Sequence, residues 1–152
     1  MKSCFFIGHR YVYDDIMELL ENAVEQHIVE YGVTEFFVGG YGQFDAFAAG
    51  AVIKAKKHHP EILLRFLLPY HPAERRIELP LGFDSSFYPP GMERVPRRFA
   101  IVRANQYMVD HVDYLIAYAW HPSGSARKIL EYAQKREQQN RIKVTLIEYK
   151  WD

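Results

Sequence analysis

Val38-Gly39-Gly40-Tyr41-Gly42-Gln43-Phe44-Asp45 is the stretch of sequence that decides the fold. It continues a short apolar run that starts at Phe36 and precedes a helix-like run from Ala46 to Lys57. Three glycines between a strand and a helix allow the backbone to turn sharply and to approach a ligand closely. The amides at the start of the next helix then face any anion in the loop, which suits a nucleotide phosphate. Because Asp45 occupies the last glycine position, this glycine loop differs from the dinucleotide-binding fingerprint G-x-G-x-x-G.

Strand-like and helix-like segments alternate on both sides of the glycine loop. The predicted strands are 3–7, 35–38, 62–68, 114–118 and 142–147, and the predicted helices are 15–31, 45–58, 97–111 and 125–138. Such alternation predicts a Rossmann-like three-layer α/β/α fold with a mostly parallel sheet of about five strands. A chain of this length is typical of one domain, so we expect residues 1–152 to form a single one.

Residues 69–96 interrupt this alternation with a long proline-rich excursion. It holds six of the eight prolines and shows no clear period. Loops longer than about 12–15 residues are uncommon in compact domains and are usually functional or disordered. The aromatic residues Tyr70, Phe83, Phe87 and Tyr88 argue against disorder. We therefore expect an ordered excursion that packs near the ligand site, or alternatively a structural arm that covers a face or a subunit contact.

Composition and charge exclude several classes of protein. Basic and acidic residues number 19 each, so a protein that binds nucleic acid through bulk charge is not expected. No apolar stretch approaches the roughly 20 residues of a membrane-spanning helix, and the first apolar block is too short for a signal peptide. The single cysteine, Cys4, lies in an apolar run and is interpreted as a buried thiol. These features predict a cytoplasmic protein without membrane contact.

The predicted topology brings three loops together at one edge of the sheet. In a Rossmann-like strand order the first strand neighbours the one that ends at Tyr118, and ligands bind where the sheet changes direction between them. The loops that meet there are Gly8-His9-Arg10, the glycine loop and 120–127. Gly39, Gly40 and Gly42 then offer backbone amides to a phosphate; the alternative is a tight turn without a ligand.

Several side chains in these loops each fit two roles, one structural and one in ligand binding. Asp45 suits the N-cap of the second long helix, and it also suits a hydrogen bond to ribose hydroxyls. Ser123-Gly124-Ser125, with Arg127 in the first turn of the helix, forms either a second anion cradle or simply a helix cap beside an exposed arginine. His9 and Arg10 end at the same crevice, where His9 either titrates near neutral pH or serves as a hydrogen-bonding wall.

Motifs for other chemistries are absent from the sequence. It contains no H-E-x-x-H, no C-x-x-C and no histidine pair at ligand spacing beside a carboxylate, so no metal site is expected. It also lacks a G-x-S-x-G nucleophile elbow and a G-K-[ST] phosphate-binding loop. No cofactor is indicated.

Taken in order, the motifs resemble the SLOG superfamily, in particular the small bacterial members of its DUF1273/YpsA-like group. The stretches that carry the resemblance are Phe6-Ile7-Gly8-His9-Arg10, the glycine loop, Leu68-Pro69-Tyr70, Phe87-Tyr88-Pro89-Pro90 and 97–101, followed by Asn105, Met108 and Asp113. The resemblance covers nearly the whole chain. It implies a Rossmann-like domain that binds a nucleotide or nucleotide-derived ligand, and it adds Asn105 to the expected ligand-binding residues. The glycine loop is also similar to that of the DNA-processing protein A group, which binds single-stranded DNA.

The better-known relatives in that superfamily are LOG phosphoribohydrolases, which cleave the N-glycosidic bond of nucleoside monophosphates. Their signature is a helical arginine followed by P-G-G-x-G-T-x-x-E. Here the arginine position holds Ala104, with Arg103 one residue away, and one residue on a helix is a rotation of about 100°. The second motif is replaced by 122–128, and its acid has only Glu131 nearby. These departures leave Asp45, Arg103 and Glu131 as weak catalytic candidates.

The preferred reading is a protein that binds or senses a nucleotide-derived small molecule without turnover. The alternative is an N-glycosidase that acts on a nucleoside monophosphate and uses Arg103 with a carboxylate. Single-stranded nucleic-acid binding is a weaker third reading, because zero net charge gives little affinity from counterion release. LOG-like relatives usually dimerise, so a homodimer is expected.

Overall fold

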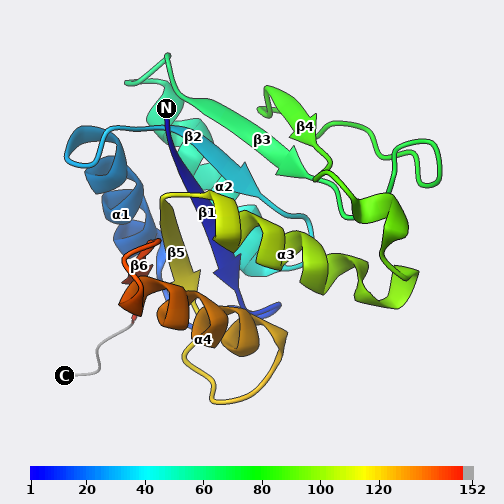
Figure 1. Ribbon diagram of the computed structural model, residues 1–152. Helices are drawn as coiled ribbons and strands as arrows, with labels where there is room; N and C mark the ends of the chain where they lie inside the picture. The colour runs from blue at the N-terminus through cyan, green and yellow to red at the C-terminus, as the bar shows by residue number, and fades with distance from the viewer. Residues whose placement is uncertain (149–152) are drawn as a thin grey trace.

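The computed structural model describes residues 1–148 and has an α/β architecture (Figure 1). Six strands form one sheet in the order β4-β3-β2-β1-β5-β6, and every neighbouring pair is parallel. The strands are β1 (Lys2–Gly8), β2 (Val33–Val38), β3 (Leu63–Leu67), β4 (Ser85–Phe87), β5 (Tyr114–Tyr118) and β6 (Lys143–Leu146). The order reverses between β1 and β5, which places a topological switch point at the carboxyl end of β1.

Four helices cover the two faces of the sheet. They are α1 (Met17–Val29), α2 (Gln43–Lys56), α3 (Ala100–His111) and α4 (Ser125–Gln138), with two 3₁₀ turns at Met92–Arg94 and Arg97–Phe99. Figure 1 shows α3 and α4 in front of the sheet and α2 behind it, and α1 packs against α2. The predicted three-layer α/β/α fold is therefore confirmed. No helix within the described part of the chain has both the length and the apolar composition that a bilayer crossing requires.

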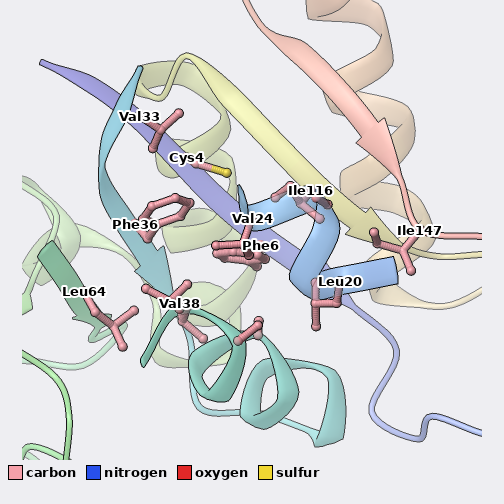
Figure 2. Packing of buried hydrophobic residues seen from close by; sticks show 14 of the residues in the cluster. Cys4, Phe6, Leu20, Val24, Val33, Phe36, Val38, Leu64, Ile116 and Ile147 are labelled. Carbon is pink, nitrogen blue, oxygen red and sulfur yellow. The ribbon is translucent and has the colours of Figure 1, made fainter. Parts of the chain in front are cut away.

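The strands carry apolar side chains on both faces because each face is covered by helices. Cys4 and Phe6 of β1 pack towards α1 and α2 with Phe36 of β2 (Figure 2). Phe5 and Ile7 alternate with them and pack towards α3 and α4. Cys4 is fully buried, and burial raises the pKa of its thiol well above the usual value. This agrees with the predicted inert core thiol.

The excursion contains the strand that the sequence did not reveal. β4 pairs with β3 at the sheet edge, with Arg65 opposite Ser85 and Leu67 opposite Phe87. The sheet thus has six parallel strands where about five were predicted. Apolar side chains anchor the excursion to the body of the molecule: Phe83 packs on the core under α1 and α2, and Phe87 packs on the core under α3 and α4. The segment 83–87 of the excursion therefore joins the packed body of the molecule, whereas residues 71–82 are exposed.

Three helix starts differ from the prediction, and one of them is that of α3, which begins at Ala100 after the 3₁₀ turn at Arg97–Phe99 and not at 97. Helix α1 begins at Met17, two residues after the predicted start, and its N-cap position is Ile16 without a side-chain cap. Helix α2 begins at Gln43 with Gly42 at the N-cap position, which places Asp45 in the first turn instead of at the cap. The backbone already turns at Gly42, and Asp45 therefore lies one turn further into the helix than its residue type suggested.

Candidate functional site

A cavity of about 370 Å³ lies at the carboxyl ends of the central strands, beside the switch point. Its floor comes from the face of β1 and β3 that packs towards α3, and its rim comes from the loops that follow β1, β2 and β5. The residues that line it are Phe5, Phe6, Ile7, Gly8, His9, Arg10, Gly39, Tyr41, Asp45, Leu67, Pro69, Ile101, Ala104, Asn105, Gly124, Ser125 and Ala126. An apolar floor with a few polar groups at the rim is typical of small-molecule sites, and the volume falls within their usual range.

Two glycines of this region are required by close packing. A Cβ on Gly8 would lie 2.2 Å from the ring of Phe44, and a Cβ on Gly42 would lie 2.7 Å from the Cα of Arg10. The second contact locks the glycine loop onto the end of β1, because the amide of Gln43 also donates to the carbonyl of Arg10 at 2.8 Å. The side chain of Gln43 in turn accepts from the amide of Val12 at 2.7 Å. The sequence predicts a ligand-binding role for Gly42. Its close contact with Arg10 accounts for a glycine at this position without any ligand.

Asp45 is the acidic group of the cavity. Its Oδ2 accepts the amide hydrogen of Tyr41 at 3.1 Å and lies close to Gly39, where a Cβ would be 3.2 Å away. Burial raises the pKa of Asp45 to about 6, and the Tyr41 amide only partly opposes this rise. The carboxyl is therefore mostly ionised at neutral pH but close to titration, and it disfavours a phosphate next to the glycine loop.

The start of α4 offers the better place for an anion. Gly124, at the N-cap position, adopts φ 104° and ψ 170°, a conformation open to glycine, and no side chain caps the helix. The first turn carries no acidic residue. Gly124, Ser125 and Ala126 line the cavity, so the uncapped amides and the positive end of the helix dipole are at its wall.

His9 lies in the cavity wall as a neutral ring. Burial lowers its pKa, with smaller contributions from His121 and Arg127. The amide of His121 donates to Nε2 of His9 at 3.0 Å, so the neutral ring carries its proton on Nδ1. His9 thus supplies a neutral hydrogen-bond donor and not a cation. The rim cation is Arg10, whose side chain is exposed.

The structure brings together many of the predicted residues, but not all. Gly8, His9, Arg10, Gly39, Asp45, Asn105, Gly124 and Ser125 line the cavity, whereas Gly40, Gly42, Ser123, Arg127, Arg103 and Glu131 do not. Arg127 turns back to donate to the carbonyl of Ala119 at 3.1 Å, and its Nε lies 3.7 Å from the exposed Glu131. Arg103 lines a separate groove on the outer side of α3. Arg103 therefore does not line the cavity that holds Asp45, and Glu131 lies outside that cavity as well.

Sequence reasoning missed most of the apolar wall. Ile101 and Ala104 reach the cavity from α3, and Leu67 and Pro69 reach it from the end of β3. Tyr41 belongs to the quoted glycine loop, and its position after the second strand was the signal that could have identified it. The apolar residues carry no such signal, because core positions have the same residue types and spacing. Within residues 1–148 no cluster of three or more His, Cys, Asp and Glu side chains is arranged to hold a metal ion.

Comparison with known proteins gives the family. No family model matches the chain. The UPF0398 protein BH1768 of Halalkalibacterium halodurans is 31% identical over 140 residues, which cover 84% of this chain and 74% of that protein. Among solved structures, S. aureus TarJ in complex with NADPH is similar at 14% identity and a TM-score of 0.39, over 87% of this chain and 42% of the TarJ chain. A structural likeness this low carries no argument about the ligand. The sequence likeness to the first protein is sufficient: the chain belongs to the UPF0398 family.

Proposed function

We propose that this protein binds a nucleotide or a nucleotide-derived small molecule in the cavity at the carboxyl ends of its strands. The observation that carries the proposal is the pairing, in one cavity, of an uncapped helix N-terminus at Gly124–Ala126 with a carboxylate at Asp45. The first suits a phosphate, and the second suits the hydroxyls of a ribose. The resemblance of the sequence to the SLOG superfamily supports the same reading, and we propose membership in that superfamily as well.

The charge of Asp45 sets the orientation of the ligand. An ionised carboxylate repels phosphate, so the phosphate binds at α4 and the ribose at the glycine loop. The amides of the glycine loop support this orientation, because those of Tyr41 and Gln43 already donate within the protein. Asn105 of α3 also lines the cavity, and its side-chain amide offers a donor and an acceptor to either group.

A matched pair of variants on one helix tests the proposal. Asn105 lines the cavity, whereas its neighbour Gln106 lines the groove on the outer side of α3. Thermal shift and titration calorimetry against mononucleotides, ADP-ribose, NAD and cyclic nucleotides identify a ligand, since a ligand at 100 times its dissociation constant stabilises by about 2.7 kcal/mol. We expect Asn105→Ala to weaken binding about tenfold and Gln106→Ala to leave it unchanged. Equal affinity in both variants and the wild type would place the ligand elsewhere.

An N-glycosidase activity is the second candidate function, and it rests on Asp45 alone. A carboxyl with a pKa of about 6 inside a substrate-sized cavity has the acid–base character that glycosidic cleavage needs. With Arg103 and Glu131 outside the cavity, no second catalytic group is available among the earlier candidates. Release of free base from AMP or GMP, followed by chromatography and abolished in Asp45→Asn, would establish turnover. Bound but intact nucleotide supports the first function.

A further inference from the structure

The order of the strands arranges the parts of a bound nucleotide along the edge of the sheet. The start of α4 follows β5, the glycine loop follows β2, and the excursion follows β3, with β1 between the first two. If, as proposed above, the phosphate binds at α4 and the ribose at Asp45, the base extends towards the end of β3. The assignment of that end of the cavity to the base rests on the proposed function.

The excursion meets the glycine loop at this end of the cavity. Tyr41 and Pro69 line the cavity, and Tyr70 follows directly. Burial and the neighbouring Tyr70 raise the pKa of the Tyr41 phenol, while the charge of Arg75 and its hydrogen bond to the phenol act to lower it. Tyr70 and Arg75 therefore lie beside Tyr41, just outside the set of residues that line the cavity. The guanidinium carbon of Arg75 lies 4.8 Å from the centre of the Tyr70 ring, which holds the arginine in place through a cation–π contact.

Arg75 has donors available for a ligand. Arg97 also lies over Tyr70, at 5.6 Å, but Glu74 approaches it to 3.6 Å and offsets its charge. In contrast, no acidic side chain in residues 1–148 lies within ion-pairing distance of Arg75, and its side chain is exposed. A guanidinium presents five N–H donors in a planar fork. One of them is used in the hydrogen bond to the Tyr41 hydroxyl and none in the contact with the Tyr70 ring, so the other donors remain for a ligand.

We infer that Tyr41, Tyr70 and Arg75 form the binding wall for the base of the nucleotide, and that Arg75 selects a purine with a carbonyl group at position 6. The tyrosine rings offer flat surfaces for stacking. Guanine and hypoxanthine present two acceptors, O6 and N7, on one edge, which match the fork of an arginine. Adenine presents a donor at N6 in the same place and repels one arm of that fork. The excursion is thus the part of the chain that sets base specificity.

Calorimetric titrations with GMP, IMP, AMP and ribose 5-phosphate test this assignment. Arg75→Gln removes the guanidinium, and Arg76→Gln is its matched control, because both side chains are exposed neighbours on the excursion. We expect the wild type and Arg76→Gln to bind GMP and IMP at least about tenfold more tightly than AMP. In Arg75→Gln that preference disappears, and the affinity for ribose 5-phosphate is the same in all three proteins.

The other outcomes test the base assignment and the proposed nucleotide binding separately. A wild type that prefers AMP, or an Arg75→Gln variant that keeps the preference for GMP, would overturn the base assignment alone. A loss of ribose 5-phosphate affinity in Arg75→Gln would also overturn it, because Arg75 would then contact the phosphate. Absence of binding by all four compounds would overturn the base wall, and if ADP-ribose, NAD and cyclic nucleotides also fail to bind, the proposed function is overturned as well.

Discussion

The Oδ2 atom of Asp45 accepts the amide hydrogen of Tyr41 at 3.1 Å, and this bond closes the glycine loop over the first turn of α2. The same carboxyl is sufficiently buried for its pKa to rise to about 6. Folding therefore places an acid where its charge is costly, in the wall of a cavity. Ionisable groups whose pKa is shifted by burial and which lie in the wall of a cavity are common at functional sites.

Replacement of Asp45 by asparagine is expected to stabilise the unliganded protein at alkaline pH. The folded protein keeps a proton on Asp45 at pH values where the unfolded chain has lost it. The contribution of this carboxyl to stability is therefore fully present below pH ~4 and is lost as the pH rises through about 6. Since asparagine can still accept the Tyr41 amide, Asp45→Asn should gain up to about 3 kcal/mol at pH 8, measured by urea unfolding.

Asp84 provides the control of opposite sign. Burial acts to raise the pKa of Asp84, but the hydrogen bond from the Leu64 amide and the pairing with Lys56 outweigh it, and the pKa is lowered. Asp84→Asn should therefore lose stability at pH 8. If Asp45→Asn also lost stability at that pH, the carboxylate of Asp45 would be a structural group and not a destabilised functional one.

The glycine at position 8 is expected to be intolerant of any side chain. A Cβ there would overlap the ring of Phe44, a fully buried residue that has no room to move. We expect Gly8→Ala to cost roughly 1–3 kcal/mol in thermal or urea unfolding. Gly50 in α2 is the control, because a Cβ there meets no atom within 4 Å. Gly50→Ala should stabilise by about 0.5–1 kcal/mol through helix propensity. Similar effects of the two substitutions would contradict the packing.

Buried His27 predicts a second pH dependence, at the opposite end of the sheet. Its side chain is fully buried; Nδ1 lies 2.6 Å from the carbonyl of Ala23, and Nε2 has no partner among the described residues. Burial, with a smaller effect of Lys143, lowers its pKa. The unfolded chain then takes up a proton at a higher pH than the folded one. The stability that neutral His27 contributes is present above pH ~6.5 and falls as the pH decreases below it.

The variant His27→Phe tests this point in an Asp45→Asn background, where the opposing titration of Asp45 is absent. Tyr31 and Tyr114 already pack edge-on against the His27 ring, so a phenyl ring has suitable neighbours. We expect the free energy of unfolding of the variant to vary less between pH 7 and pH 5 than that of its parent. An unchanged slope would show that His27 does not titrate in this range.

Trp120 provides a spectroscopic probe of the loop between β5 and α4. Its indole is half exposed, yet Nε1 donates to the hydroxyl of Tyr118 at 3.0 Å, and that hydroxyl donates to Asp14 at 2.7 Å. In a Trp151→Phe background, Trp120 is the single tryptophan. We expect Tyr118→Phe to lower its fluorescence anisotropy, because the indole loses its fixed orientation. Tyr132→Phe, which removes a hydroxyl bonded to Asp110 outside this network, should leave the anisotropy unchanged.

The fold followed from the sequence because its central strands β1, β2 and β5 contain apolar runs, and segments of helical periodicity separate them. Helix 125–138 was predicted with the bounds that the structure shows, since Gly124 and Ser125 mark its start clearly. Strand β4 was not predicted, because three residues in a proline-rich segment carry no period. They form a strand only because the edge of β3 is there to pair with them. The homodimer and the cytoplasmic location stay predictions.

The site was predictable to the extent that topology determines it. Loops that follow neighbouring parallel strands must meet, which identified Gly8, Asp45 and Gly124. Which side of each loop faces the cavity depends on packing in three dimensions: Gly42 is used to contact Arg10, and Arg127 is used to hold the end of β5. Neither use has a signature in the sequence.

The most direct test of the central claim is an NMR titration of the ¹⁵N-labelled protein with GMP. The account predicts that amide chemical shifts change in a connected set around the cavity, with the largest changes at Gly124–Ala126 and further changes at Gly8–Arg10, Tyr41 and Asn105. Changes confined to the outer side of α3, around Arg103 and Gln106, or an unchanged spectrum at millimolar GMP, would contradict it.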